Sequence, residues 1–206
     1  GIENEPGNPA REIENLGGHL FKSPQSGKVV EISLNGARNL TDEDLIHLSS
    51  YRFLTDLSLE RTTITGSGFI HLAKLEKLEW LNLWQTQVDD RALARIAGLK
   101  NLKHLPIGST RITDAGLKHL RKMPNLIYLG LRDTGITDAG AVNLVALPAL
   151  QELNLRNTGV TDKCIDSLLQ IKTLQKLWLG ETAISAMGFK RLRSGLPRCK
   201  IDLTGN

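Results

Sequence analysis

One ten-residue segment of the chain occurs twice, because LRDTGITDAG at 131–140 returns as LRNTGVTDKC at 155–164, displaced by 24 residues. The same displacement runs through the rest of the sequence. The pattern L-x-x-L-x-L begins at Leu54, Leu78, Leu102, Leu126, Leu150 and Leu174, and its frame continues into Ile201 and Leu203. A fixed period of this length indicates a repeat architecture, in which like units stack on one another.

The first unit departs from this period. Val29, Ile32 and Leu34 begin the same apolar pattern, but the step from Leu34 to Leu40 is one residue longer than the step from Leu59 to Ile64. We therefore expect an insertion in the first turn.

Each unit also repeats its polar positions. Threonine follows the last strand apolar by three residues, at Thr62, Thr86, Thr110, Thr134, Thr158 and Thr182. Three residues later comes Thr65, Asp89, Thr113, Thr137, Thr161 or Ser185, and an acid follows at Asp90, Asp114, Asp138 and Asp162. Such a hydroxyl or carboxylate followed by a negative charge suits the start of a helix, so we expect each aspartate to serve its own helix.

The segments after these caps carry apolar residues three apart, as in Leu93 with Ile96 and Ile165 with Leu168. This spacing predicts a short helix with one buried stripe. Each unit is therefore predicted to be strand, turn and short helix. A unit of this size cannot bury its apolar face alone, but stacked units form a continuous core.

The recurring pattern L-x-x-L-x-L-x-x-T-x-I-T-D-x-G-L resembles the leucine-rich repeat family over about residues 29–203. Its T-D-x-G-L ending resembles the bacterial short-repeat branch and is similar to the cysteine-containing repeats of F-box proteins. Threonine stands where that branch has Asn or Cys, and we expect it to hydrogen-bond neighbouring turns. The resemblance implies an α/β right-handed solenoid shaped as a horseshoe arc, with a parallel sheet on the concave face and short helices on the convex face.

The predicted organisation has three parts. Residues 1–7 are expected to form a flexible linker, and residues 8–28 an N-terminal cap made of a short helix and a strand. Asn8 would cap that helix and Gly17 would end it. Residues 29–206 would form the repeat domain, with a closing strand at its C-terminal end.

Composition narrows the class of protein. The 206 residues are 40% hydrophobic and 23% charged, which is typical of one globular unit. The net charge of +4 does not by itself predict a nucleic-acid partner, and none is expected. No apolar run approaches the roughly 18 residues of a membrane span, so no membrane-spanning helix is expected. We expect a monomer.

The two cysteines fall in different units and at different phases of the repeat. Cys164 and Cys199 would be separated by about two strand spacings, roughly 10 Å, which is too far for a disulfide. Free thiols are expected. They suit a cytosolic protein as well as an exported one, whereas the resembling bacterial branch favours an exported or cell-envelope location.

The x positions of L-x-x-L-x-L-x should face outward on the concave side, because successive strand residues point to opposite faces. They form three rows across the strands. The first row is Glu31, Asp56, Trp80, His104, Tyr128, Glu152, Lys176 and Lys200. The second row is Ser33, Ser58, Asn82, Pro106, Gly130, Asn154, Trp178 and Asp202. The third row is Asn35, Glu60, Trp84, Gly108, Arg132, Arg156, Gly180 and Thr204.

All three tryptophans lie in these rows, where the repeat does not require them. Aromatic residues and arginine are enriched at binding hot spots. The predicted contacts for a protein or peptide partner are Trp80, Trp84, His104, Tyr128, Arg132, Arg156 and Trp178. Two alternatives remain open: these side chains bind a carbohydrate or another small ligand, or they only pack on each other in a purely structural scaffold.

Three further features of the concave face follow from the rows. Trp80, His104 and Tyr128 would form an aromatic strip, and Gly108 and Gly130 could leave a hollow between Trp84 and Arg132. Arg132 and Arg156 would stack, with their repulsion offset by an anion or by Asp133 and Glu152. Acids gather toward the N-terminal side and bases toward the C-terminal side, so a partner of opposite polarity would bind in one orientation.

Metal, cofactor and catalytic sites are not predicted. His47, His71 and His119 share one helix position, but Arg95 interrupts the series. The chain has no Gly-rich phosphate loop and no G-x-S-x-G motif. The pair His104 and Tyr128 lacks a nucleophile. The sequence therefore favours a non-catalytic recognition module.

Overall fold

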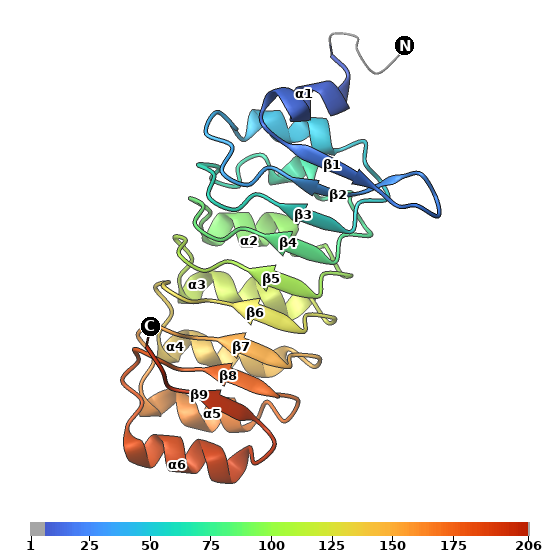
Figure 1. The fold of residues 1–206 in the computed structure, drawn as a ribbon. Helices are drawn as coiled ribbons and strands as arrows, with labels where there is room; N and C mark the ends of the chain where they lie inside the picture. Colours follow the sequence, from blue (N-terminus) through green and yellow to red (C-terminus); the bar gives the residue numbers. More distant parts are fainter. Residues whose placement is uncertain (1–6, 206) are drawn as a thin grey trace.

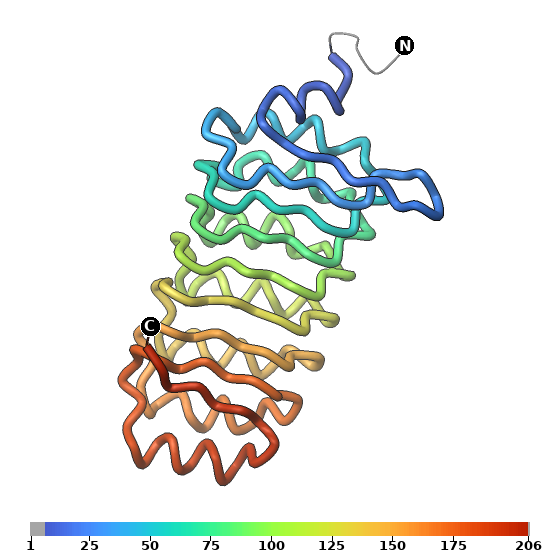
Figure 2. Tube along the Cα trace, viewed as in Figure 1, coloured from blue at the N-terminus to red at the C-terminus, as the bar shows by residue number. Residues whose placement is uncertain are grey.

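The computed structural model describes residues 7–205 and shows an open stack of strands and short helices. Strands line one face of the stack and helices line the other, and the chain advances along it from blue to red without crossing back (Figure 1). The tube view shows the same succession of similar loops (Figure 2). Most of the predicted linker, residues 1–6, lies outside the described residues.

The strands form one sheet in which spatial order follows chain order. The nine strands are β1 (His19–Lys22), β2 (Val29–Ser33), β3 (Asp56–Ser58), β4 (Trp80–Asn82), β5 (His104–Pro106), β6 (Tyr128–Gly130), β7 (Glu152–Asn154), β8 (Lys176–Trp178) and β9 (Lys200–Asp202). β1 pairs with β2 antiparallel, and each later pair is parallel. The predicted parallel sheet on one face of a solenoid is confirmed.

The opposite face carries short helices. The α-helices are α1 (Pro9–Asn15), α2 (Asp90–Ile96), α3 (Asp114–Leu117), α4 (Asp138–Ala141), α5 (Ile165–Leu169) and α6 (Ala186–Gly195). The 3-10 segments are η2 (Glu43–Leu48), η3 (Phe69–His71), η4 (Lys118–Lys122), η5 (Val142–Ala146) and η6 (Asp162–Cys164). Several predicted helices are thus partly or wholly 3-10, because the unit leaves only a few residues per helix and their apolar side chains lie three apart.

The core confirms the phase of the repeat. The central strand leucines are in register, with Leu57 beside Leu81 and Leu129 beside Leu153, and all four are 0% exposed. Each unit therefore buries its apolar positions against the next, as a solenoid requires.

The recurring threonines close the turn after each strand. The Thr62 hydroxyl donates to the carbonyl of Leu59 at 2.7 Å, and Thr86 donates to Leu83 at the same distance. The prediction that these threonines bond neighbouring turns is wrong, because the acceptor lies three residues back in the same turn. The residue before each threonine has positive φ: Arg61, Gln85, Ser109, Asp133, Asn157 and Glu181. No glycine occupies this position, so its left-handed backbone was not evident from the sequence.

The recurring aspartates join consecutive units. Asp138 accepts the backbone N–H of Thr161 at 2.8 Å and the Thr161 hydroxyl at 2.7 Å, and Thr161 caps the following helix. Asp90, Asp114 and Asp162 bond the next unit's cap in the same way. The prediction that each aspartate serves only its own helix is therefore incomplete, since its carboxylate also holds the next one.

The first turn shows a stronger form of this link. Asp42 accepts the N–H of Thr65 at 2.9 Å, the Thr65 hydroxyl at 3.0 Å, and the N–H groups of Gly66 and Gly68 at 2.9 and 3.1 Å. Burial alone would raise the pKa of Asp42, but these hydrogen bonds outweigh it and lower the pKa below 3.8.

The N-terminal end is covered by α1 and β1. The Asn8 side chain accepts the N–H of Ala10 at 2.9 Å, and Ile13 is 1% exposed. Gly17, with φ of 91°, follows the helix. The predicted helix and its cap are confirmed.

Both cysteines are free thiols, as predicted. Cys164 is fully buried in the position that other units give to a small residue, and burial raises the pKa of its thiol to about 12. It therefore remains a neutral packing residue.

Candidate functional site

The concave face carries the predicted rows as they were read from the sequence. Glu31, Asp56, Trp80, His104 and Tyr128 stand beside one another on consecutive strands. In β3 to β8 the central leucine between the first-row and second-row residues is buried, so the two rows share the opposite, concave face. None of the three indoles lies in the core: Trp80 is 41% exposed, and Trp84 and Trp178 are half-buried.

The predicted aromatic strip divides into two pairs. The rings of Trp80 and His104 lie 4.9 Å apart at a tilt of 33°. Tyr128 instead meets Trp178 edge to face, with ring centroids 6.3 Å apart. Tyr128 belongs to β6 and Trp178 to β8, so this contact crosses the intervening strand β7. The second-row residue of β7 is Asn154, whose side chain is small enough to allow the contact.

The Tyr128 phenol remains a hydrogen-bond donor at neutral pH. Its burial, and secondarily the negative charge of Glu152, raises the pKa of the phenol above 10.0, although a hydrogen bond with Asn154 opposes this. The hydroxyl is therefore available in its neutral form at the edge of the hollow described next.

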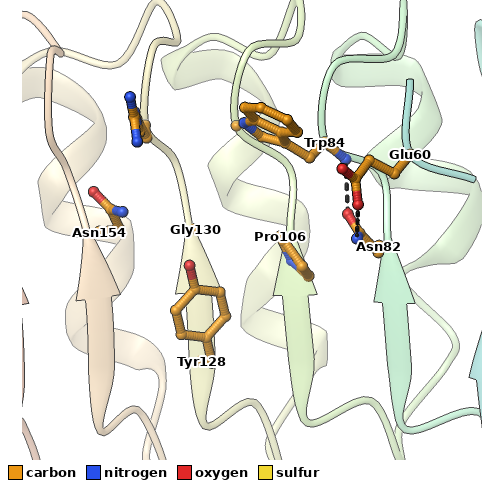
Figure 3. A pocket seen from close by; sticks show the side chains of 9 residues that line it. Glu60, Asn82, Trp84, Pro106, Tyr128, Gly130 and Asn154 are labelled. Carbon is orange, nitrogen blue, oxygen red and sulfur yellow. Dashed lines mark hydrogen bonds between the residues drawn. The ribbon is translucent and has the colours of Figure 1, made fainter. Parts of the chain in front are cut away.

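The predicted hollow is present beside Trp84 and Arg132. It has a volume of about 240 Å³, and it is lined by Glu60, Asn82, Trp84, Pro106, Gly108, Tyr128, Gly130, Arg132 and Asn154. Figure 3 shows Trp84, Tyr128 and Asn154 arranged around the backbone near Pro106 and Gly130. We call this the tryptophan hollow.

Two glycines keep the tryptophan hollow open. A Cβ at Gly108 would lie 3.1 Å from Trp84 Cδ1 and 2.8 Å from the carbonyl oxygen of Arg132, and one at Gly130 would lie 2.8 Å from the Tyr128 hydroxyl. Any other residue at either position would fill or deform the space.

The ring of Trp84 makes a cation–π contact with an arginine. The Arg61 guanidinium carbon lies 5.2 Å from the Trp84 ring centre, and its Nε lies 3.7 Å from Glu60. Glu60 in turn accepts a hydrogen bond from the Asn82 amide at 2.9 Å (Figure 3). An arginine, a tryptophan and a carboxylate thus fix the N-terminal wall of the hollow.

The two third-row arginines differ in exposure. Arg132 pairs with Asp133 at 3.3 Å, and its side chain is 39% exposed. Arg156 is only 7% exposed as a residue and pairs with Glu181 at 2.9 Å. Of the two acids predicted to offset these arginines, Asp133 pairs with Arg132, whereas Arg156 pairs with Glu181, a turn residue of positive φ.

Charge compensation divides the concave face. Toward the C-terminal end, Arg132, Arg156 and Lys176 each pair with an acid, the last with Asp202 at 3.9 Å. Toward the N-terminal end, neither Glu31 nor Asp56 forms an ion pair with any residue in the described part of the chain. The predicted separation of acids from bases is present, but three of its four bases are paired, and among the described residues Lys200 is the one without an ion pair.

Sequence reasoning missed Phe21 as a part of this face and the hydrogen bonds of two second-row asparagines. Phe21 of β1 pairs with Glu31 and is 50% exposed, so it extends the first row by one strand. The alternation in HLFK could have revealed it, since Leu20 packs on the core. Asn82 and Asn154 accept the N–H groups two residues on, of Trp84 and Arg156, at 3.0 Å each.

Two kinds of functional element are absent from residues 7–205. No group of three or more His, Cys, Asp and Glu side chains there could hold a metal ion. Across the same residues, no helix combines the length and the apolarity needed to cross a membrane.

Comparison with known proteins agrees with this architecture. A family model described as Leucine Rich repeat matches residues 122–145. No curated protein sequence matches the chain significantly. The matched segment is one repeat of the stack, and the stacked units with their concave sheet have the architecture of a leucine-rich repeat solenoid.

Solved structures share the fold at low identity. Internalin C2 of Listeria monocytogenes is 22% identical with a TM-score of 0.65, and the match covers 97% of this chain and 93% of that one. Internalin InlF of the same organism is 21% identical with a TM-score of 0.61 over 79% of this chain, which spans about half (51%) of InlF.

A plant receptor also shares the fold. The ectodomain of the Arabidopsis thaliana receptor kinase GASSHO1/SCHENGEN3, solved in complex with CASPARIAN STRIP INTEGRITY FACTOR 2, is 14% identical with a TM-score of 0.59. The match covers 88% of this chain and 25% of that one. These likenesses concern the solenoid and not its ligands.

Proposed function

We propose that this protein is a non-catalytic recognition module that binds a protein or peptide through its concave face. The contacts are Trp80, Trp84, His104, Tyr128, Arg132 and Trp178, with Arg156 acting from beneath by holding Glu181. The observation that carries this proposal is the tryptophan hollow, which two glycines keep open and which aromatic, guanidinium and amide groups surround.

The shape of the tryptophan hollow favours a side chain of a polypeptide as its occupant. Its volume of about 240 Å³ suits one large residue, and its walls offer the Trp84 indole and the Tyr128 hydroxyl. Trp84 is already held by Arg61, so binding immobilises little further. A rigid aromatic anchor in a concave site with few polar groups is the usual form of a recognition pocket.

The comparisons support the protein-binding class. One solved neighbour is a receptor kinase ectodomain in complex with CASPARIAN STRIP INTEGRITY FACTOR 2, and another is the plant peptide hormone receptor RGFR1 in complex with RGF2, at 19% identity and a TM-score of 0.55. We extend to this chain the general role of such a solenoid, together with an exported or cell-envelope location. Its oligomeric state is proposed to be monomeric.

A random peptide library displayed on phage tests the proposal. The immobilised protein should enrich peptides that share a bulky residue, and Trp84→Ala should weaken the selected peptides at least about tenfold, or about 1.4 kcal/mol. Ile70→Ala is the matched control, since Ile70 is 71% exposed and belongs to η3 on the convex side. It should leave binding unchanged.

A glycan array provides the opposing arm. Binding of a sugar that is lost in Trp84→Ala, together with no enriched peptide, would reverse the proposal in favour of carbohydrate recognition. Equal peptide binding by Trp84→Ala and wild type, with both proteins folded by circular dichroism, would remove the hollow from the site.

A further inference from the structure

We infer that the N-terminal half of the concave face, beside the tryptophan hollow, binds an arginine side chain of the polypeptide partner. This inference rests on the proposed function and names the chemistry of one partner residue. The site consists of Phe21, Glu31, Asp56 and Trp80, which stand in this order across the first row on β1 to β4. We call it the acidic–aromatic row.

The row places two carboxylates between two open aromatic rings. Phe21 is 50% exposed and Trp80 is 41% exposed. Neighbouring strands are about 4.8 Å apart, so the two acids stand side by side and the two rings flank them. A hollow of about 290 Å³ lies over the part of the row from Glu31 to Trp80, without Phe21, and is lined by Glu31, Ile32, Asn35, Asp56, Leu57, Ser58, Trp80 and Asn82.

The two carboxylates lack compensation in the described structure. Glu31 forms no ion pair, and Asp56 accepts only the neighbouring Thr55 hydroxyl at 2.8 Å. Like charges directly opposite each other on adjacent strands are destabilising, so the free protein bears a cost that a bound cation would offset. Toward the C-terminal end of the described face, Arg132, Arg156 and Lys176 each have an acidic partner, whereas Lys200 forms no ion pair.

Basic side chains of the protein itself stand elsewhere. Lys28 and Lys77 lie over the ring of Phe53, with their Nζ atoms 5.5 and 4.5 Å from its centre. Arg61 lies over Trp84 in the third row. These cations are therefore not placed as partners of Glu31 and Asp56.

The protein contains an internal example of the proposed chemistry. Arg61 lies 5.2 Å from the centre of Trp84 and 3.7 Å from Glu60, so a guanidinium, an indole and a carboxylate already associate in the third row. The acidic–aromatic row repeats the indole and supplies two carboxylates, but contains no guanidinium. His104 contacts the Trp80 ring at 4.9 Å, and the indole also lines the hollow beside Asp56.

Arginine fits this row better than lysine. A guanidinium is planar, stacks on an aromatic face and can donate to two oxygens at once, whereas an ammonium is a compact and strongly hydrated charge. Two carboxylates on adjacent strands match the paired donors of the guanidinium. A partner would thus place an arginine over the acidic–aromatic row and its bulky residue in the tryptophan hollow.

Titration with N-acetyl-argininamide tests the inference directly. The indole N–H signals of Trp80, Trp84 and Trp178 are assigned from Trp→Phe variants and followed by NMR. N-acetyl-argininamide should shift the Trp80 signal selectively, and N-acetyl-citrullinamide, its neutral analogue, should bind at least about tenfold more weakly. N-acetyl-lysinamide should fall between them, and added salt should weaken the response.

The double variant Glu31→Gln/Asp56→Asn provides the matched control. It keeps the size of both side chains and removes the repulsion, so its melting temperature should equal or exceed that of wild type. It should abolish the response to N-acetyl-argininamide. A response that persists in this variant, or that is equal for the citrulline analogue, would overturn the inference.

The peptide library separates this inference from the proposed function. Wild type should enrich arginine beside the bulky residue, and the double variant should enrich the bulky residue alone. Enriched peptides without an arginine preference would reject the acidic–aromatic row and leave the proposed function standing. A response to N-acetyl-argininamide with no enriched peptide would reject the proposed function and leave the cation site.

Discussion

The turns at the helix starts and the concave rows repeat with the same period but use it in opposite ways. At the helix starts, an aspartate accepts hydrogen bonds from the next unit's cap, at Thr113, Thr137, Thr161 and Ser185 in succession. Along the first concave row, the residues change from acids to aromatic rings, then to Glu152 and two lysines. The comparison teaches that stacking fixes one set of positions and leaves the other free to carry recognition.

The largest expected loss of stability comes from a substitution in the core, which the repeat fixes. Leu129→Ala removes a side chain that is 0% exposed and should lower the free energy of unfolding by about 2 to 5 kcal/mol, since it leaves a cavity. Trp80→Ala, on the concave face, should change it by less than about 0.5 kcal/mol. Urea denaturation followed by circular dichroism measures both. A melting temperature within 1 °C of wild type for Leu129→Ala would contradict the core assignment.

A smaller loss of stability is expected when the hydrogen bonds between the first two turns are removed. Asp42→Ala removes an acceptor of four hydrogen bonds from Thr65, Gly66 and Gly68, and should cost about 1.5 to 3 kcal/mol, the range for hydrogen bonds to a charged group. Glu43→Ala, at the exposed neighbouring position, should cost little. Equal denaturation midpoints for the two variants would show that the link between these turns does not stabilise the stack.

Acid should weaken the same links by a lesser amount. Hydrogen bonds lower the pKa of Asp42 and Asp162 below 3.8 in the folded protein. The stability contributed by a carboxylate of lowered pKa is present above its unfolded value and is lost as the pH falls through its folded value. The urea midpoint should therefore drop as the pH falls below about 4. Asp42→Asn should show a shallower drop, and an identical slope would exclude a contribution from Asp42.

Much of the fold followed from the period of 24 residues. Once the phase was fixed, it placed Leu57, Leu81 and Leu129 in the core and the three tryptophans on the outer face of the sheet. The sequence could not show that Asp138 reaches the cap of the next unit, because that contact depends on how far one unit is shifted against another. The phase alone says which face a side chain occupies, not which neighbour it meets.

The candidate site was predicted in position but not in contacts. Reading the rows suggested that Tyr128 meets His104, whereas Tyr128 meets Trp178 because the smaller Asn154 lies between them. Arg156 was read as exposed, yet the positive φ of Glu181 directs a carboxylate onto it. Such contacts arise from side-chain length and turn geometry, which a periodic pattern does not encode.

Each strand from β2 onward pairs in parallel with the next strand, so the units repeat at a constant spacing along the stack. Trp80 of the acidic–aromatic row and Trp84 of the tryptophan hollow belong to the same unit, so no whole unit can be inserted between the two elements. A unit duplicated between β8 and β9 would instead lengthen the concave face by one strand spacing, about 4.8 Å, and leave both elements intact. Evolution or a protein engineer could thus add a further contact to the partner in whole steps, without redesigning either element.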